Sequence, residues 1–183
     1  MKTHEYVERV LISKEEIARR VQEMGAQLTE DYRGKNPLFV CILKGAVLYF
    51  ADLVRAVDTD IELEFMAISS YGSGTTTSGE VRILKDLGVS IEGRDVVIVE
   101  DIVDTGITLN YLCKQLKTRG AKSVEIACLL TKPSRRRSEV NVKYVGFEIP
   151  NEFVIGYGLD FAEKFRNLED VCILKPMAYS SEQ

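Results

Sequence analysis

Histidine is nearly absent from this chain, since His4 is the only one among 183 residues. That count argues against a zinc site built on histidines and against a Ser-His-Asp triad. Cysteine is also sparse, and its spacing matches no metal-binding pattern. Three of the four cysteines lie in apolar runs, so we expect buried free thiols rather than disulfides at Cys41, Cys113, Cys128 and Cys172.

Long apolar runs are missing as well. No run approaches the roughly 20 residues that a membrane-spanning helix needs. The first residues, MKTHEYVERVLISKEE, lack the apolar block of a secretory signal. We therefore expect a cytoplasmic protein with no membrane partner.

The chain also lacks an excess of positive charge. The net charge is −4, which works against a broad nucleic-acid surface, because phosphate backbones reward clustered Lys and Arg. The one basic run is Arg135 to Arg137, after Pro133. It predicts either a solvated loop or a local attractor for an anionic ligand or RNA.

The composition that remains is that of one globular domain, with 45% hydrophobic residues in 183. Ser13 followed by Glu16 forms a capping box, and apolar residues at helical spacing then predict a helix over 14–29. A strand over 37–43, a glycine turn and a helix through 47–57 follow. A third helix is indicated from Ile107 to a stop at Gly120.

Strands alternate with these helices, at 37–43, 95–100 and 123–130 as mainly apolar runs and at 62–69 as a partly alternating one. This pattern predicts an α/β domain, with a doubly wound, mostly parallel sheet covered by helices on both faces. Short strands around 144–147, 152–156 and 171–175 add a smaller part. We expect a single domain over 1–183, with a core of about 36–145 and a small hood formed by about 1–35 and 146–183.

The stretch VVIVEDIVDTGITL, residues 96–109, carries the strongest functional signal. A buried strand runs into Glu100 and Asp101 at the edge where parallel sheets bind ligands. The turn that follows, residues 104–108, leads into a helix N-terminus, where free N–H groups favour an anion. Three acids beside a phosphate-type turn predict a sugar phosphate with magnesium, although Asp104 alone could simply cap the helix.

Other phosphate motifs are incomplete. The only Gly-Lys pair, Gly34-Lys35, is followed by Asn36, so no P-loop is present. Neither Gly72-Ser73-Gly74 nor Gly156-Tyr157-Gly158 completes a G-x-G-x-x-G pattern. Nucleotide-hydrolysing P-loop proteins and dinucleotide-binding domains are therefore not indicated.

With these motifs the chain resembles the type I phosphoribosyltransferase family. VVIVEDIVDTGITL is similar to the family's phosphoribosyl pyrophosphate (PRPP) signature. The resemblance extends over nearly the whole chain, through LKGA at 43–46, SSYGSG at 69–74, LLTKPSRR at 129–136, VGFEIPNEFVIGYGLDF at 145–161 and FRNL at 165–168. The motifs at 145–161 and 165–168 point to the branch that uses 6-oxopurines, hypoxanthine and guanine.

The resemblance implies a role for each part of the PRPP signature. Residues 104–108, which are Asp104, Thr105, Gly106, Ile107 and Thr108, would hold the 5′-phosphate. Glu100 and Asp101 would face the ribose hydroxyls and a Mg²⁺ ion, and Asp104 would be the general acid or base for the purine N7 proton. Some members have a basic residue where this chain has Ile107, so phosphate binding here must depend on N–H groups and hydroxyls.

The resemblance also assigns residues outside the signature. Lys44, Gly45 and Arg166 would bind pyrophosphate, and the 43–44 peptide can be cis in the family. For the purine, the implied residues are Lys132 at O6, Phe153 stacked on the ring, and Val154 and Asp160 at the base edge, with Asp160 also near a second magnesium. Ser70 and Tyr71 would belong to a lid. Taken alone, Lys44 could be a plain surface residue, Phe153 a core residue and 70–80 a loop.

The activity implied is magnesium-dependent purine salvage, in which PRPP and hypoxanthine or guanine give IMP or GMP and pyrophosphate. Two alternatives stay open. One is a regulator of the same fold that binds RNA or DNA through Arg135 to Arg137, and the other is a transferase for uracil or orotate. The family also implies a homo-oligomer, a dimer or tetramer.

Overall fold

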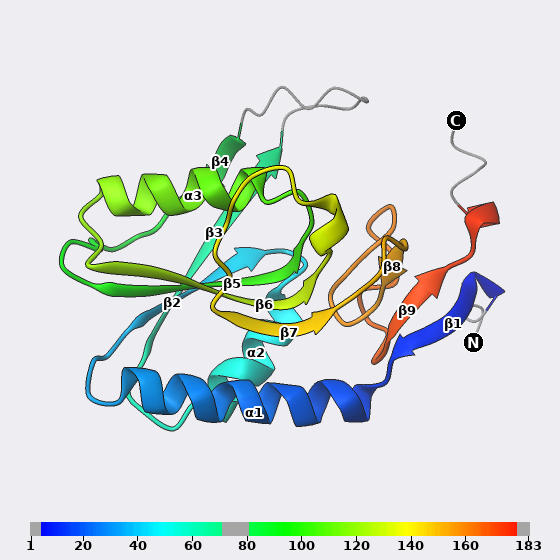
Figure 1. Ribbon diagram of the computed structural model, residues 1–183, viewed down its shortest axis with the longest axis horizontal. Helices are drawn as coiled ribbons and strands as arrows, with labels where there is room; N and C mark the ends of the chain where they lie inside the picture. Colours follow the sequence, from blue (N-terminus) through cyan, green and yellow to red (C-terminus); the bar gives the residue numbers. More distant parts are fainter. Residues whose placement is uncertain (1–4, 71–80, 179–183) are drawn as a thin grey trace.

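The computed structural model describes residues 5–70 and 81–178 (Figure 1). Two short 3₁₀ helices, Pro133–Arg135 and Pro176–Ala178, accompany the main elements. In chain order these are β1 (Val7–Ile12), α1 (Lys14–Tyr32), β2 (Leu38–Leu43), α2 (Val47–Ala56), β3 (Glu62–Ser70), β4 (Val81–Lys85), β5 (Asp95–Val103), α3 (Ile107–Thr118), β6 (Ser123–Thr131), β7 (Tyr144–Glu148), β8 (Val154–Ile155) and β9 (Val171–Leu174).

Six strands form one sheet in the order β4-β3-β2-β5-β6-β7. Every neighbouring pair is parallel except β3 and β4. Helices α1 and α2 lie on one face and α3 on the other (Figure 1). The doubly wound, mostly parallel α/β fold predicted from the sequence is thereby confirmed.

The two faces of the sheet bury separate apolar layers. On β2, Phe39 and Cys41 pack in the layer beneath α1 and α2, whereas Leu38 and Val40 pack in the layer beneath α3. Side chains alternate between the faces of a strand, so a strand covered on both sides must be apolar throughout. This is why LFVCIL is recognisable in the sequence.

Helix α1 begins as predicted. The Ser13 hydroxyl accepts a hydrogen bond from the Glu16 N–H, and the Glu16 carboxylate accepts one from the Ser13 N–H at 2.9 Å. The helix runs to Tyr32, three residues beyond the expected end, because Leu28, Thr29 and Tyr32 remain buried. It packs against α2 and β7 of the main sheet.

A second, antiparallel sheet of three strands, in the order β1-β9-β8, lies at one end of the molecule and joins the two ends of the described chain (Figure 1). Strand β1 was not predicted, because VERVLI is mostly exposed and carries charged residues. Its partner β9 is about 160 residues away in the sequence, so local pattern gives no signal for the pair.

Strand β5 is longer than the sequence pattern indicates. It continues past the apolar run to Val103, and Glu100, Ile102 and Val103 pair with Cys128, Leu130 and Thr131 of β6. The predicted end at residue 100 was therefore three residues short, since two acids interrupt the apolar pattern. The consequence is that Glu100 and Asp101 are held by the sheet rather than by a loop.

A link between α1 and β7 yields a stability prediction. The Tyr144 hydroxyl donates to the Asp31 carboxylate at 2.6 Å, and Lys143 lies 2.9 Å from the same oxygen. These contacts, with the Tyr144 hydrogen bond the largest, lower the pKa of Asp31. Because the pKa of Asp31 is lower in the folded state, its ionised carboxylate stabilises the fold above the ordinary Asp pKa of about 3.9. This stabilisation is lost as the pH falls through the pKa of Asp31 in the folded state.

We expect Asp31→Asn to lower the free energy of unfolding by about 1 kcal/mol at pH 7 and by less near pH 3. The magnitude is modest because 34% of the Asp31 side chain is exposed. Urea unfolding at the two pH values measures it, with Tyr144→Phe as the control that removes the hydroxyl alone. Equal losses at both pH values would contradict the charge-based account.

Candidate active site

Two carboxylates lie next to each other near the carboxyl end of β5. Glu100 and Asp101 are both half-buried, and the Ile102 N–H donates to Asp101 at 2.6 Å. Burial, together with the Asp101 charge, holds the pKa of Glu100 well above its usual value, and burial also raises the pKa of Asp101. Such a pair favours a cation or hydroxyl groups between the two carboxylates.

The turn after β5 is shaped by Gly106. This residue has φ +79° and is the N-cap of α3, so Asp104 does not cap the helix. A Cβ at Gly106 would lie 2.8 Å from the Ser138 carbonyl oxygen, so a side chain here would meet both backbone strain and a clash. The Thr105 carbonyl accepts hydrogen bonds from Arg137 N and Ser138 N, which fixes the turn from outside.

The basic run is a partly exposed loop, with Arg135 and Arg137 exposed, close to the solvated loop expected from the sequence. Arg135 Nε donates to Asp104 Oδ1 at 3.1 Å. Arg136 donates to the Asp104 carbonyl at 3.3 Å and to the Thr131 hydroxyl at 2.7 Å. Two of the three arginines therefore support the turn that carries Asp104, and Arg137 is exposed.

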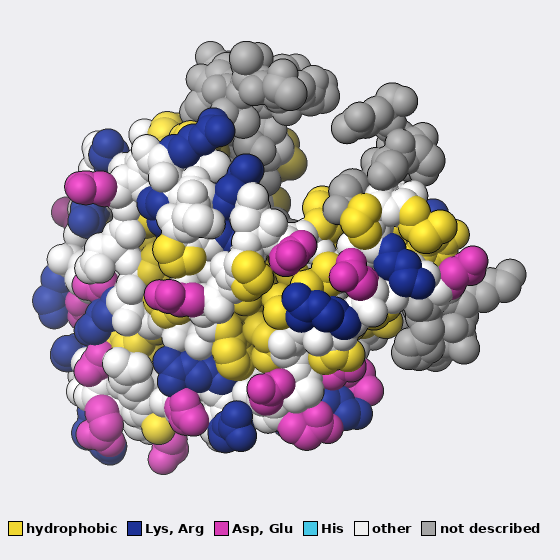
Figure 2. Space-filling view, turned by 45° about the vertical axis from the view of Figure 1, so that its right-hand side comes forward, with side chains coloured by type: hydrophobic (Ala, Val, Ile, Leu, Met, Phe, Trp, Pro, Cys, Tyr) yellow, Lys and Arg dark blue, Asp and Glu magenta, His cyan; other side chains and the backbone are white. Residues whose placement is uncertain are grey.

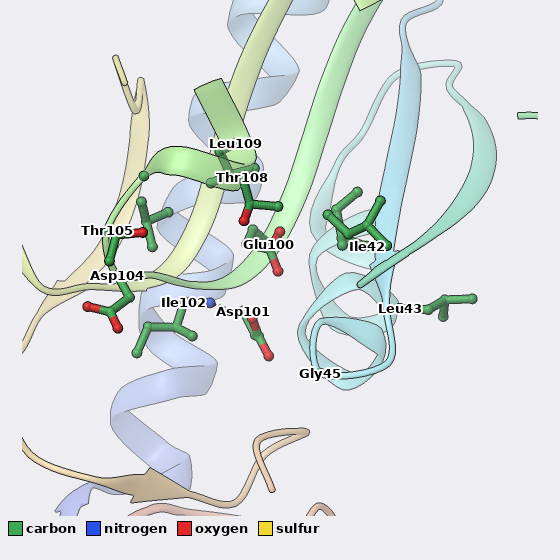
Figure 3. A pocket seen from close by; sticks show the side chains of 13 residues that line it. Ile42, Leu43, Gly45, Glu100, Asp101, Ile102, Asp104, Thr105, Thr108 and Leu109 are labelled. Atoms are coloured by element: carbon green, nitrogen blue, oxygen red, sulfur yellow. Dashed lines mark hydrogen bonds between the residues drawn. The ribbon is translucent and has the colours of Figure 1, made fainter. Parts of the chain in front are cut away.

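A cavity of about 250 Å³ joins the acid pair to this turn. Figure 3 shows Glu100 and Thr108 facing the same space, with Asp101 directed towards the loop after β2. Of the predicted residues, the cavity brings together Gly45, Glu100, Asp101, Asp104, Thr105, Gly106 and Thr108. Lys44, Ile107, Lys132, Phe153, Val154, Asp160 and Arg166 do not line it.

The loop after β2 approaches Asp101 closely at Gly45. The Leu43–Lys44 peptide is cis. A Cβ on Gly45 would lie 1.6 Å from Asp101 Oδ2, and a Cβ on Gly158 would lie 2.0 Å from the Gly45 carbonyl oxygen. The absence of both side chains lets Asp101, the β2 loop and the turn after β8 stack in direct contact.

Arg166 lies in the segment between β8 and β9. Its guanidinium donates to the Gly158 carbonyl at 2.8 Å and pairs with Asp160 at 2.9 Å. Glu163 lies 3.4 Å from the same guanidinium and 2.9 Å from Lys44 Nζ. Lys44 and Arg166, predicted from distant motifs, thus meet at one carboxylate.

The residues predicted for the purine lie at the ends of two strands. Lys132 directly follows β6, and burial lowers its pKa while the Asp104 charge opposes that shift. Phe153 precedes β8, is 41% exposed and meets Phe161 edge to face at 5.6 Å. Val154 is buried in β8, whereas Lys132 is half-buried and Phe153 is exposed, so these two side chains lie outside the apolar core.

The lid prediction falls mostly outside the described residues. Ser70 is the last residue of β3, where it pairs with Val81, and Tyr71 is not described. His4 is also outside the described ranges.

Four residues of this region were missed from the sequence. Arg135 and Arg136 had a signal, since the basic run was noted, but their partner was not foreseen. Gly158 lay in the motif at 145–161 and in an incomplete dinucleotide pattern, but it was given no role of its own. Glu163 had no signal, because its importance comes from the distance to Lys44 across the fold.

Over residues 5–70 and 81–178, no three His, Cys, Asp or Glu side chains come together as a metal-binding group. Helices long and apolar enough to cross a membrane are absent from the same residues. The face in Figure 2 mixes both signs of charge with apolar side chains, without a broad area of one sign.

Comparison with known proteins assigns the family. The phosphoribosyl transferase domain model matches residues 11–162. The hypoxanthine-guanine phosphoribosyltransferase of Bacillus subtilis is 51% identical, over 96% of this chain and 97% of that protein. The bifunctional protein TilS/HprT of Listeria monocytogenes is 53% identical over 97% of this chain, which spans 27% of that protein's length.

Solved structures agree with this result. The crystal structure of a hypoxanthine phosphoribosyltransferase from Staphylococcus aureus matches with a TM-score of 0.95 and 48% identity, over 98% of both chains. A hypoxanthine-guanine phosphoribosyltransferase from Bacillus anthracis matches with a TM-score of 0.89 and 40% identity, over 92% of this chain and 99% of that one. The chain therefore belongs to the phosphoribosyltransferase family, within its hypoxanthine-guanine branch.

Proposed function

We propose that the chain transfers the 5-phosphoribosyl group of PRPP to hypoxanthine, guanine or both, giving IMP or GMP and pyrophosphate, and that it acts in purine salvage. The observation that carries the proposal is one cavity lined both by two carboxylates and by a phosphate-type turn. A sugar phosphate offers hydroxyls to the first and an anion to the second. The named relatives support the same activity.

The 5′-phosphate binds at residues 104–108. The first N–H groups of α3 have no partner within the helix, and Thr105 and Thr108 add hydroxyl donors beside them. Gly106 allows the backbone to approach the phosphate. Ile107 contributes only its N–H, so no side-chain cation is part of this cradle.

Glu100 and Asp101 bind the ribose hydroxyls and hold Mg²⁺. The pair fits a divalent cation, because burial raises the pKa of both carboxyls, the Asp101 charge raises that of Glu100 further, and a cation relieves that cost. Their oxygens are the hard ligands that Mg²⁺ prefers, and substrate oxygens and water would have to supply the remaining ligands. When bound, the ion supplies positive charge that steadies the departing diphosphate.

The carboxylates also act directly on the sugar. Cleavage of the bond to pyrophosphate leads, so the ribose carbon becomes positive before the purine attacks. The negative charges of Glu100 and Asp101, held rigidly by β5, favour that state. At the leaving end, Lys44, Arg166 and the N–H of Gly45 bind pyrophosphate.

The purine binds between the ends of β6 and β8. Asp104 accepts the N7 proton, Lys132 donates to O6, and Phe153 stacks on the ring while main-chain groups of Val154 and Asp160 bind the base edge. Asp160 is also the candidate for a second magnesium, although its carboxylate accepts from Glu163 N and pairs with Arg166. A cation opposite a carbonyl selects a 6-oxopurine over adenine.

We expect Lys132→Met to raise the KM for hypoxanthine about 10- to 100-fold, the value of one charge-assisted hydrogen bond, while the KM for PRPP changes little. Initial rates with each substrate varied in turn measure the split. Lys164→Met, which removes an exposed lysine of the β8–β9 segment, is the control. An equal rise in both KM values would contradict base recognition by Lys132.

The proposal is tested by mixing the protein with PRPP, Mg²⁺ and, in turn, hypoxanthine, guanine, xanthine, adenine and uracil. Nucleotide formation is followed by absorbance. Product with hypoxanthine or guanine is expected, and product with uracil alone would assign a pyrimidine transferase instead. A protein inactive with every 6-oxopurine would refute the proposal.

The rest of the proposal concerns organisation. It takes residues 1–183 as one domain, with a core of about 36–145 and a hood from about 1–35 and 146–183. It includes a lid containing Ser70 and Tyr71, a homo-oligomer and a cytoplasmic location. These parts follow from the family resemblance, and the match over residues 11–162 supports the single domain.

A further inference from the structure

One carboxylate oxygen joins the two cations that the proposed function places at pyrophosphate. Glu163 Oε2 lies 2.9 Å from Lys44 Nζ and 3.4 Å from Arg166. Lys44 follows β2 of the main sheet, whereas Glu163 and Arg166 lie between β8 and β9 of the other sheet. A single anionic oxygen therefore bridges the two sheets at this place.

The backbone holds Glu163 in this position. Residues 161–164 form a tight turn in which Phe161 and Lys164 exchange two main-chain hydrogen bonds, of 3.1 and 3.0 Å. Glu163 itself has φ +62°, and its N–H donates to Asp160 at 2.8 Å. This φ is uncommon for a non-glycine residue and costs free energy. The hydrogen bonds of the turn must offset that cost and so hold Glu163 in place.

A diphosphate would bind Lys44 and Arg166 through anionic oxygens of the same kind. Lys44 and Arg166 both contact the same Glu163 oxygen. Pyrophosphate therefore cannot contact both cations in these positions while Glu163 remains there. Lys44 pairs only with Glu163 among the ion pairs of the described residues, and Arg166 also pairs with Asp160. The lysine is thus the contact that pyrophosphate must take over.

Resting on the proposed function, we propose that Glu163 is an internal anion that takes the pyrophosphate position whenever no diphosphate is bound and competes with pyrophosphate for Lys44 and Arg166. Tethered by the 161–164 turn, the carboxylate returns to the cations when the product leaves. It weakens pyrophosphate binding and speeds its release.

The competition is mild. Glu163 and Lys44 side chains are 66% and 67% exposed, and exposed ion pairs are weak. The Arg166 side chain, at 25% exposure, is better shielded from water and makes the longer contact. Removing the charge is therefore expected to tighten pyrophosphate binding by about 2- to 5-fold rather than by orders of magnitude.

The experiment measures binding of pyrophosphate with Mg²⁺ by calorimetry to the wild-type protein, to Glu163→Gln and to Glu169→Gln. Glu169 is the matched control, because it is an exposed glutamate of the same segment that pairs with Lys14 at 2.9 Å, away from Lys44. Tighter binding is expected for Glu163→Gln alone. Unchanged or weaker binding would overturn the inference, and so would equal tightening in both variants.

A kinetic readout separates competition from a structural role. Product inhibition by pyrophosphate should strengthen in Glu163→Gln while the KM for hypoxanthine stays the same. A change in the hypoxanthine KM without one in pyrophosphate inhibition would assign Glu163 to loop structure and overturn the inference.

Lys44→Gln shows which idea fails. If pyrophosphate binds the wild type and loses affinity in Lys44→Gln, but Glu163→Gln binds like the wild type, only the role of Glu163 is refuted. If Lys44→Gln binds pyrophosphate as the wild type does, two ideas are refuted together: the competition by Glu163 and the binding of pyrophosphate by Lys44 in the proposed function.

Discussion

Replacing Asp104 with Asn is expected to lower kcat by about 10²- to 10⁴-fold, the usual contribution of a general acid or base, with little change in the KM for PRPP. Asn keeps the size of the side chain but cannot take the purine N7 proton. The carboxylate is in place for that role because it is half-buried at the cavity and does not cap α3. Initial rates with PRPP and hypoxanthine measure the effect.

Arg135→Gln separates proton transfer from positioning. The substitution removes the partner that lies 3.1 Å from Asp104 Oδ1 and leaves the carboxylate itself. A loss of a few fold is expected, because the ion pair is about 40% exposed on both sides. If Arg135→Gln were as damaging as Asp104→Asn, the ion pair rather than the proton would explain both losses. Turnover near wild type in Asp104→Asn would remove the acid-base role.

Local features of the sequence were enough for four strands of the main sheet and for the phosphate-type turn, whereas β4 was not predicted and β7 was assigned to the smaller part. Strand β2 is apolar because both of its faces are buried, and helix α1 carries its own capping box. The turn at residues 104–108 was predictable because glycine, threonine and the helix start are adjacent in the chain. Such signals act over a few residues, where sequence and conformation are closely coupled.

Features that depend on distant partners were not predictable. Strand β1 carries two charged residues beside its apolar ones, and its strand pairing comes from the distant β9. The end of β5 was misplaced because pairing with β6 overrides the polarity of its two acids. The contact of Glu163 with Lys44 joins residues 119 positions apart, so no local pattern could indicate it.

The stack of Asp101, Gly45 and Gly158 provides the second large effect. We expect Gly45→Ala to lower kcat/KM for PRPP by on the order of 10²-fold, because misplacing a positioned group by about 1 Å can cost that much. The new Cβ would lie 1.6 Å from Asp101 Oδ2, so the carboxylate must move away from the ribose and magnesium position. The obstacle is the end of a side chain, so the melting temperature should change little.

Gly158→Ala should behave differently. Its Cβ would meet the Gly45 carbonyl oxygen at 2.0 Å, and φ is +101°. Backbone cannot rotate away as a carboxylate can, so both the melting temperature and kcat/KM should fall. Gly34→Ala is the matched control for backbone strain, since Gly34 has φ +72° with no atom within 4 Å of a new Cβ.

Thermal melts and PRPP kinetics on the three variants distinguish strain from the clash. Gly34→Ala should lose only the stability that a left-handed alanine costs, about 1 kcal/mol, and keep full activity. Gly45→Ala should show the reverse, with activity lost and stability kept. Wild-type kinetics in Gly45→Ala would mean that the position of Asp101 does not limit PRPP use, which would remove Asp101 from the ribose and magnesium site.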